Sequence, residues 1–187
     1  MANDIQQNRF QQIIIEHLPY EIRMLRYSFS RLQEIKEGDT DGNAFVECFC
    51  IHARNLIDFF RDRKPYSDNQ ACAHHFTETT YSPFQKGEID TRLYDKVNKQ
   101  IAHLTYHRST HEKDKIGQAD RNKLLKILQD EIALFSAQLK PEYKSMWRPD
   151  LSNKLVPLPS LGRFNATTTN IATISVITLN NDFERKS

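Results

Sequence analysis

The spacing of apolar side chains between residues 18 and 32 is the feature that most limits how this chain can fold. Five of them follow one another at intervals of four, three, four and three residues, the repeat of one face of an α-helix. Gly38 then provides a helix stop. The segment therefore predicts an amphipathic helix with one buried side, and its apolar positions are Leu18, Ile22, Leu25, Phe29 and Leu32.

The same periodicity recurs along the chain. Residues 43–61 carry two adjacent apolar stripes, which predict the most buried helix, and further helices are expected over about 88–108 and from Asp120 to Leu139. A short helix capped by Asp4 precedes Pro19, which suits the first turn of the next helix. We therefore predict an all-α fold, an up-down bundle of four to five helices. The positions expected to be buried together are Phe49, Leu56, Val97, Ile101, Leu128, Ile132 and Phe135.

The length of 187 residues fits one domain with an appendage. We place the helical bundle at residues 1–147 and a C-terminal tail, flexible or loosely packed, at 148–187. Three prolines interrupt the start of this tail, and residues 165–181 contain no charged side chain. Turn-forming residues also break the periodicity over 64–88, which predicts a connecting loop.

Composition excludes several classes of function. The chain has 26 basic and 24 acidic residues, a net charge of +2 that is too small to attract nucleic acid or an anionic membrane by itself. No apolar run of about 18 residues and no signal sequence is present, so we expect a cytoplasmic protein without membrane contact. The scattered glycines form no phosphate-binding loop, and we expect no cofactor and no metal. The cysteines are expected to be reduced thiols in or near the core: Cys48, Cys50 and Cys72.

A basic strip on the helix expected over 88–108 is the main candidate for chemistry. Arg92, Lys96, Lys99 and His103 stand at spacings of four, three and four, so their side chains point within roughly 60° of one another. Cationic side chains attract phosphates, and an imidazole exchanges protons near neutral pH. Tyr106 lies just beyond the strip. The pattern indicates an RNA site, with a solvated, basic helix face as the alternative.

Residues 94–105, with the sequence YDKVNKQIAHLT, resemble the motif helix of the HEPN superfamily. Its members are four-helix proteins of toxin, phage-defence and RNA-processing systems, and the resemblance extends more weakly over residues 19–139. Their motif is an Arg followed by four to six residues and a His. His103 matches the His, while Lys96, Val97 and Asn98 occupy the positions open to the Arg.

The resemblance implies a HEPN-like protein of a bacterial defence or toxin system with metal-independent RNA cleavage or RNA binding. Two copies would face each other in a homodimer. His103 and Asn98 are then the candidate catalytic residues. The alternative is a non-catalytic helical module that binds a partner protein, such as an antitoxin or a nucleotidyltransferase. For the RNA hypothesis, the basic strip and its neighbour supply the candidate substrate-binding residues: Arg92, Lys96, Lys99 and Tyr106.

Other polar residues admit simpler interpretations. His52 lies on the apolar face of its helix, which favours a hydrogen-bonded core histidine. The alternative is that His52, Arg54 and Asp58 support the motif helix from an adjacent one. Arg54 and Asp58 are one turn apart and are expected to pair. His103, His107 and His111 recur every four residues and are a weaker candidate for a metal site. His74 and His75 are expected to form a surface pair.

Overall fold

The computed structural model describes residues 2–35, 39–61, 71–84, 89–101 and 115–149, and in these ranges the protein is helical without a strand. The predicted all-α bundle is confirmed. The predicted tail lies outside the described residues from position 150 onward. The helices are α1 (Ala2–Gln12), the π-helical turn η1 (Ile13–His17), α2 (Leu18–Glu34), α3 (Thr40–Arg61), the 3-10 turn η2 (Ala73–His75), α4 (Thr91–Ile101), α5 (Gln118–Ala137) and α6 (Pro141–Lys144).

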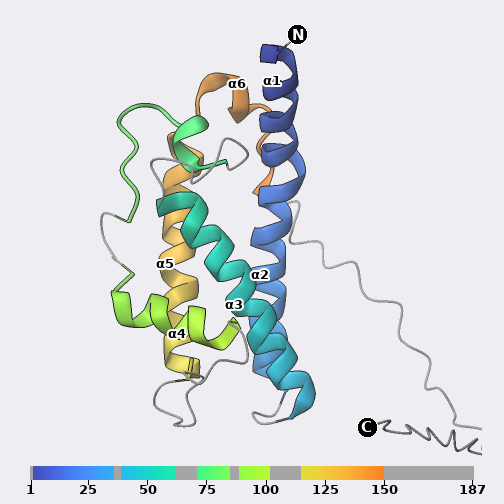
Figure 1. Ribbon diagram of the computed structural model, residues 1–187, viewed down its shortest axis with the longest axis vertical. Helices are drawn as coiled ribbons and strands as arrows, with labels where there is room; N and C mark the ends of the chain where they lie inside the picture. Colours follow the sequence, from blue (N-terminus) through green and yellow to red (C-terminus); the bar gives the residue numbers. More distant parts are fainter. Residues whose placement is uncertain (1, 36–38, 62–70, 85–88, 102–114, 150–187) are drawn as a thin grey trace, which may run out of the picture. The chain divides into compact units, whose positions relative to one another are not determined.

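Helix α3 is the centre of the bundle. It packs along α2 and also contacts α4, α5 and η2, which agrees with the two apolar stripes that its sequence carries. Figure 1 shows α2 and α5 running along the long direction of the bundle and α3 running obliquely, while the short α4 lies across it. The helix with the candidate motif is therefore held from one side by α3 and by the start of α5.

The core consists mainly of the residues that the periodicity marks. Of the seven positions expected to be buried together, six are buried, and the side chain of Ile101 lies outside the described ones. Aromatic rings of α3 and α5 meet edge to face, with the Phe60 and Phe135 centroids 5.5 Å apart and those of Phe59 and Phe135 5.7 Å apart. Each such pair contributes about 0.5–1.5 kcal/mol to stability beyond the burial of its apolar surface.

The first two predicted helices are joined without a break. The chain passes from α1 to α2 through η1, whose wide turn ends where the Leu18 N–H donates to the Ile13 carbonyl. Pro19 stands in the first turn of α2 as predicted. Proline has no N–H, and its ring clashes with the carbonyl four residues earlier in a regular α-helix, so a wider turn before Pro19 accommodates it.

The buried face of α5 extends beyond the three positions of this helix that were expected to be buried. Leu124 is fully buried and Leu125 only partly, because α5 packs against both α3 and α2. The helix begins at Gln118, two residues before the predicted start at Asp120. Leu139 is buried, but it lies beyond the helix in an antiparallel bridge with Thr77.

The predicted loop is packed against the bundle over residues 71–84. Glu131 of α5 fixes it, since this buried carboxylate accepts hydrogen bonds from the Tyr81 hydroxyl (2.5 Å) and the Phe84 N–H (2.7 Å). Phe84 has a φ of 55°, a left-handed conformation that the Glu131 contact holds in place. The segment is thus an ordered part of the fold, anchored by a side chain nearly fifty positions away.

The prediction that His74 and His75 form a surface pair is wrong. Both are half-buried, because the η2 turn directs them inward. The His75 ring stacks on Phe10 at 5.1 Å, and His74 meets the edge of Tyr81 at 5.4 Å. Burial lowers the pKa of His75, and Lys140 adds to this effect.

The cysteines occupy the positions expected of reduced thiols. Cys50 and Cys72 are buried, Cys48 is half-buried, and none forms a disulfide. Burial raises the pKa of Cys50 to about 12, so its sulfur stays protonated and unreactive.

Candidate functional site

Helix α4 divides its residues between the core and solvent. Leu93 and Val97 are buried against the bundle, whereas Arg92 and Lys99 are exposed. The helix starts at an Asp90 side chain whose Oδ1 accepts the Leu93 N–H at 2.6 Å, an arrangement typical of a helix cap. The periodicity of α4 therefore presents part of the predicted basic strip to solvent.

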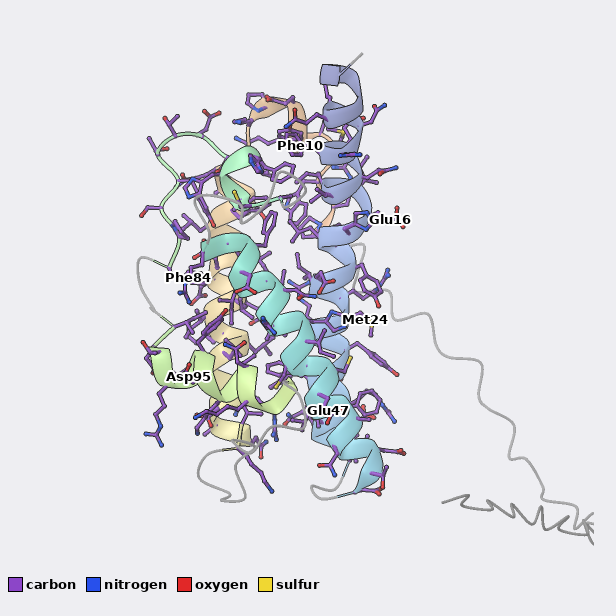
Figure 2. All side chains as sticks on the ribbon, in the orientation of Figure 1. Phe10, Glu16, Met24, Glu47, Phe84 and Asp95 are labelled. Carbon is purple, nitrogen blue, oxygen red and sulfur yellow. The ribbon has the colours of Figure 1, made fainter. Side chains whose placement is uncertain are left out.

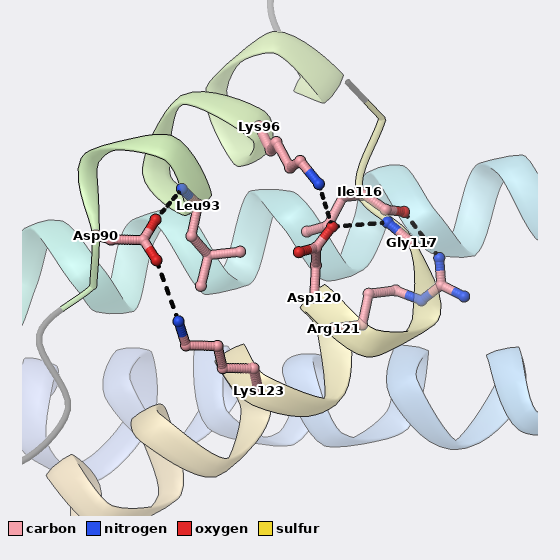
Figure 3. A network of polar contacts seen from close by, with 8 residues as sticks. All are labelled: Asp90, Leu93, Lys96, Ile116, Gly117, Asp120, Arg121 and Lys123. Carbon is pink, nitrogen blue, oxygen red and sulfur yellow. Dashed lines mark hydrogen bonds and ion pairs between the residues drawn. The ribbon is translucent and has the colours of Figure 1, made fainter. Parts of the chain in front are cut away.

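Two ion pairs join the segment 90–96 to the start of α5 (Figure 3). The Lys96 ammonium lies 2.5 Å from Asp120 Oδ2, and the Lys123 ammonium lies 3.1 Å from Asp90 Oδ2. Each segment thus supplies one lysine and one carboxylate. The Lys96 side chain is 13% exposed and that of Lys123 is 55% exposed, so the Lys96 pair is the better shielded from water.

Both carboxylates of these pairs are ionised at neutral pH. Burial alone would raise the pKa of Asp120, but the hydrogen bonds from Lys96 and the Gly117 N–H outweigh it and the pKa is lowered. The pKa of Asp90 is lowered by the Leu93 N–H and then by Lys123. The charge of Lys96 is consequently balanced within the protein.

A small cavity lies between these charged groups. Its volume is about 170 Å³, and its lining includes the exposed Arg92 beside the two ion pairs. Three basic and two acidic side chains surround it, which leaves a small excess of positive charge. The residues that line it are Asp90, Arg92, Leu93, Lys96, Asp120 and Lys123.

A second polar network ties α4 to α3. The Tyr94 hydroxyl donates to Asp58 Oδ1 at 2.8 Å, and Arg54 Nε lies 3.6 Å from Asp58 Oδ2. The Arg61 guanidinium covers the Tyr94 ring at 4.9 Å from its centroid. Burial and the Asp58 carboxylate both raise the pKa of Tyr94, so the hydroxyl keeps its proton at neutral pH. The predicted Arg54–Asp58 pair is confirmed.

Asn98 is oriented by this network. The Tyr94 hydroxyl donates its proton to Asp58, so the Tyr94 oxygen accepts a hydrogen bond from the side-chain NH₂ group of Asn98. This second hydrogen bond stabilises the phenolate form and so opposes the rise of the Tyr94 pKa. The Asn98 carbonyl oxygen then faces away from Tyr94. It is buried and has no hydrogen-bond partner among the described residues. A buried acceptor without a partner costs about 1–3 kcal/mol, which makes it a candidate ligand-binding atom.

The predicted site residues fall into three groups. Arg92 and Lys99 are exposed on α4, while Lys96 and Asn98 are half-buried and held by Asp120 and Tyr94. His103 and Tyr106 lie outside the described residues, as do His107 and His111. Within the described ranges, no three His, Cys, Asp or Glu side chains are placed to hold a metal ion.

His52 is a hydrogen-bonded core histidine, as predicted. It is 7% exposed, and its Nδ1 lies 2.7 Å from Glu21 Oε2, which also accepts from Asn55 at 3.1 Å. His52, Arg54 and Asp58 were the candidates for support of the motif helix, which is α4. Of these, Asp58 contacts α4 directly, because it accepts a hydrogen bond from Tyr94.

The sequence analysis did not identify Asp90 and Asp120 as ion-pair partners of the lysines. Each stands at the start of a predicted helix, where an acidic residue is common, and that position was their only signal. Their lysine partners lie 33 and 24 positions away along the chain.

No protein-family model matches the sequence, and comparisons with curated proteins and with solved structures found no match. None of the described helices combines the length and apolar character needed to cross a membrane.

Proposed function

We propose that this is an RNA-directed, HEPN-like protein of a bacterial defence or toxin system, with its site on α4. The observation that carries the proposal is the Asn98 carbonyl oxygen, a buried acceptor without a partner among the described residues. It stands on the same helix as the exposed cations Arg92 and Lys99, and five positions before His103. An acceptor for a hydroxyl group and cations for phosphates, carried by one helix, suit a ligand that has both groups.

Each side chain has a role in the proposed cleavage of RNA. Arg92 and Lys99 attract the phosphates, and Asn98 accepts a hydrogen bond from a ribose 2′-OH. The 2′-oxygen attacks the adjacent phosphorus, the bond to the 5′-oxygen breaks, and a 2′,3′-cyclic phosphate forms. His103 transfers protons between the attacking hydroxyl and the leaving oxygen. Lys96, already paired with Asp120, holds α4 in position.

The superfamily resemblance further suggests that the active form is a homodimer with its motif helices face to face. Tyr106 would then lie near the dimer contact and beside the bound strand. Sedimentation of the purified protein at micromolar concentration tests this part of the proposal, and a monomer there would contradict it.

Cleavage assays with the intact chain in EDTA test the chemistry. The parent protein should cut RNA and leave cyclic-phosphate ends. His103→Ala should reduce the rate by about 10²–10⁴ with nearly unchanged RNA affinity, because an acid–base group contributes little to ground-state binding. Asn98→Ala should lower the rate less. The proposal is wrong if the parent neither cuts nor binds RNA.

Salt dependence separates the phosphate contacts from the protein's internal pairs. Lys99→Ala should weaken RNA binding evenly across sequences and reduce the slope of log K against log salt by about one. Lys126→Ala, which removes another exposed lysine, on α5, is the matched control. Equal effects of the two variants would show that binding is spread over the surface rather than placed on α4.

A partner-protein module is the second candidate. The pairing of Lys96 and Lys123 with carboxylates favours it, because those charges are balanced internally. In that case the parent would show no RNA cleavage, and His103→Ala would change neither RNA affinity nor the stability of the fold.

A further inference from the structure

The large apolar side chains that are exposed in the described part of the chain gather on one surface. Within the described ranges, three large hydrophobic residues are strongly exposed: Ile15 at 57%, Tyr20 at 43% and Ile51 at 41%. Ile15 and Tyr20 line the same cavity, which has a volume of about 440 Å³. Exposed apolar residues that cluster, rather than scatter, are typical of a binding surface.

Ile51 lies on the flank of α3 that adjoins α2. Three residues before it, Cys48 interacts with Ser28 of α2, and four residues after it, Asn55 donates to Glu21 of α2. Because positions three and four apart share a helix face, Ile51 must lie along this seam. The next residue, His52, contacts Tyr20 with ring centroids 5.6 Å apart. The apolar surface therefore continues from η1 across the start of α2 to α3.

Tyr20 is held firmly although it is exposed. The edge of its ring meets His52, which Glu21 fixes in turn, and the Arg23 guanidinium stands 5.6 Å from its centroid. A ring already fixed in place loses little conformational entropy when a partner covers it. Tyrosine and arginine are also the residue types that carry most of the energy in protein interfaces.

The charges that line this cavity are mainly positive. Arg23 and Arg148 line the cavity, with Glu16 as its only acidic residue among the described lining. Both arginines are exposed, and Arg148 comes from the segment that follows α6. The surface therefore combines an apolar centre with two cations at its edge.

We propose that the surface formed by Ile15, Tyr20, Ile51, Arg23 and Arg148 binds an acidic segment of a partner protein that carries an apolar anchor. Charge complementarity selects this occupant. A second copy of the chain would bring the same two arginines toward each other across a twofold contact. RNA would satisfy the arginines but leave the aliphatic side chains of Ile15 and Ile51 without a matching surface.

The site is separate from the proposed RNA site on α4, so the two proposals can fail independently. None of its residues belongs to α4 or to the ion pairs that hold that helix. Lys99→Ala should weaken RNA binding and leave binding at this surface unchanged.

Selection of a random library of 16-residue displayed peptides on the intact chain tests the proposal. The enriched sequences should combine Asp or Glu with Leu, Phe or Trp. For the synthetic consensus peptide, Tyr20→Ala should weaken binding about 10- to 30-fold, and Arg23→Glu about tenfold with a strong dependence on salt. Tyr20→Phe, which keeps the ring, and the distant Lys126→Glu should bind within about threefold of the parent.

Four results would overturn the proposal. The enriched peptides could lack acidic residues, or Tyr20→Ala and Arg23→Glu could bind the consensus peptide as well as the parent does. Single-stranded RNA that displaces the peptide would assign the surface to nucleic acid instead. A dimer in sedimentation that Ile51→Asp dissolves would assign it to self-association. Melting curves of the variants, matched to the parent, ensure that lost binding does not reflect lost folding.

Discussion

The contact between α3 and α5 and the attachment of α4 are built in different ways. Phe60 of α3 and Phe135 of α5 meet in a fully buried aromatic cluster. Helix α4 also buries apolar residues, but the Lys96–Asp120 pair and the Tyr94–Asp58 hydrogen bond fix it as well. Figure 2 shows the side chains that fill the space between the helices. Apolar contacts depend little on salt or pH, whereas ionic ones depend on both. The part of the molecule that holds the candidate site is therefore the part that solution conditions can loosen.

The largest expected effect comes from breaking the apolar contact. Phe135→Ala should lower the free energy of unfolding by about 3–5 kcal/mol, because it leaves a cavity among Phe59, Phe60 and Trp147. Urea unfolding followed by circular dichroism measures the change. Lys126→Ala on the exposed face of the same helix should change it by less than about 0.5 kcal/mol. Equal stabilities for the two variants would contradict the packing.

Breaking the ionic attachment should have a smaller and more local effect. Asp120→Asn leaves Lys96 half-buried without its counter-charge, at an expected cost of about 1–2 kcal/mol after allowance for partial exposure. Hydrogen exchange should become faster in α4 than in α3. Asp130→Asn, which removes the exposed partner of Lys126 on the same helix, is the matched control. Uniform exchange over both helices would show that α4 does not depend on the pair.

Acid should loosen the same attachment. The folded protein lowers the pKa of Asp120 and Asp90, so these carboxylates stabilise the fold above their ordinary pKa of about 3.9. That stability is lost as the pH falls through the lowered values. The difference in urea midpoint between the parent and Asp120→Asn should therefore shrink below about pH 4. A difference that stays constant from pH 6 to pH 3 would show that the charge of Asp120 is unimportant.

The smallest effect is expected at the exposed end of the α3–α4 network. Arg54→Gln removes a pair in which the Arg54 side chain is 44% exposed, so the free energy of unfolding should fall by only about 0.2–0.5 kcal/mol. The loss should vanish at about 1 M salt, where screening is nearly complete. A loss above about 1 kcal/mol would mean that Asp58 needs Arg54 to hold Tyr94.

The sequence by itself determined the helices and most of the core. Helical spacing marks Phe49, Leu56, Val97, Leu128 and Phe135 as apolar positions on three helices, and burial of apolar surface requires them to meet. The same local rules identified the Arg54–Asp58 pair, because both residues lie one turn apart on one helix. Patterns within a single helix are readable because the helix repeat fixes which side chains are neighbours.

Only the tertiary structure decided the partners that come from different elements. Lys96 belongs to a basic strip in the sequence, yet Asp120 lies beside it because α4 crosses the start of α5. The contacts of Glu131 with Phe84 and of His52 with Glu21 likewise join residues from different segments that the fold brings together. Such pairings depend on how helices cross and on how far each side chain reaches, and these depend on the packing of the whole core rather than on the local repeat.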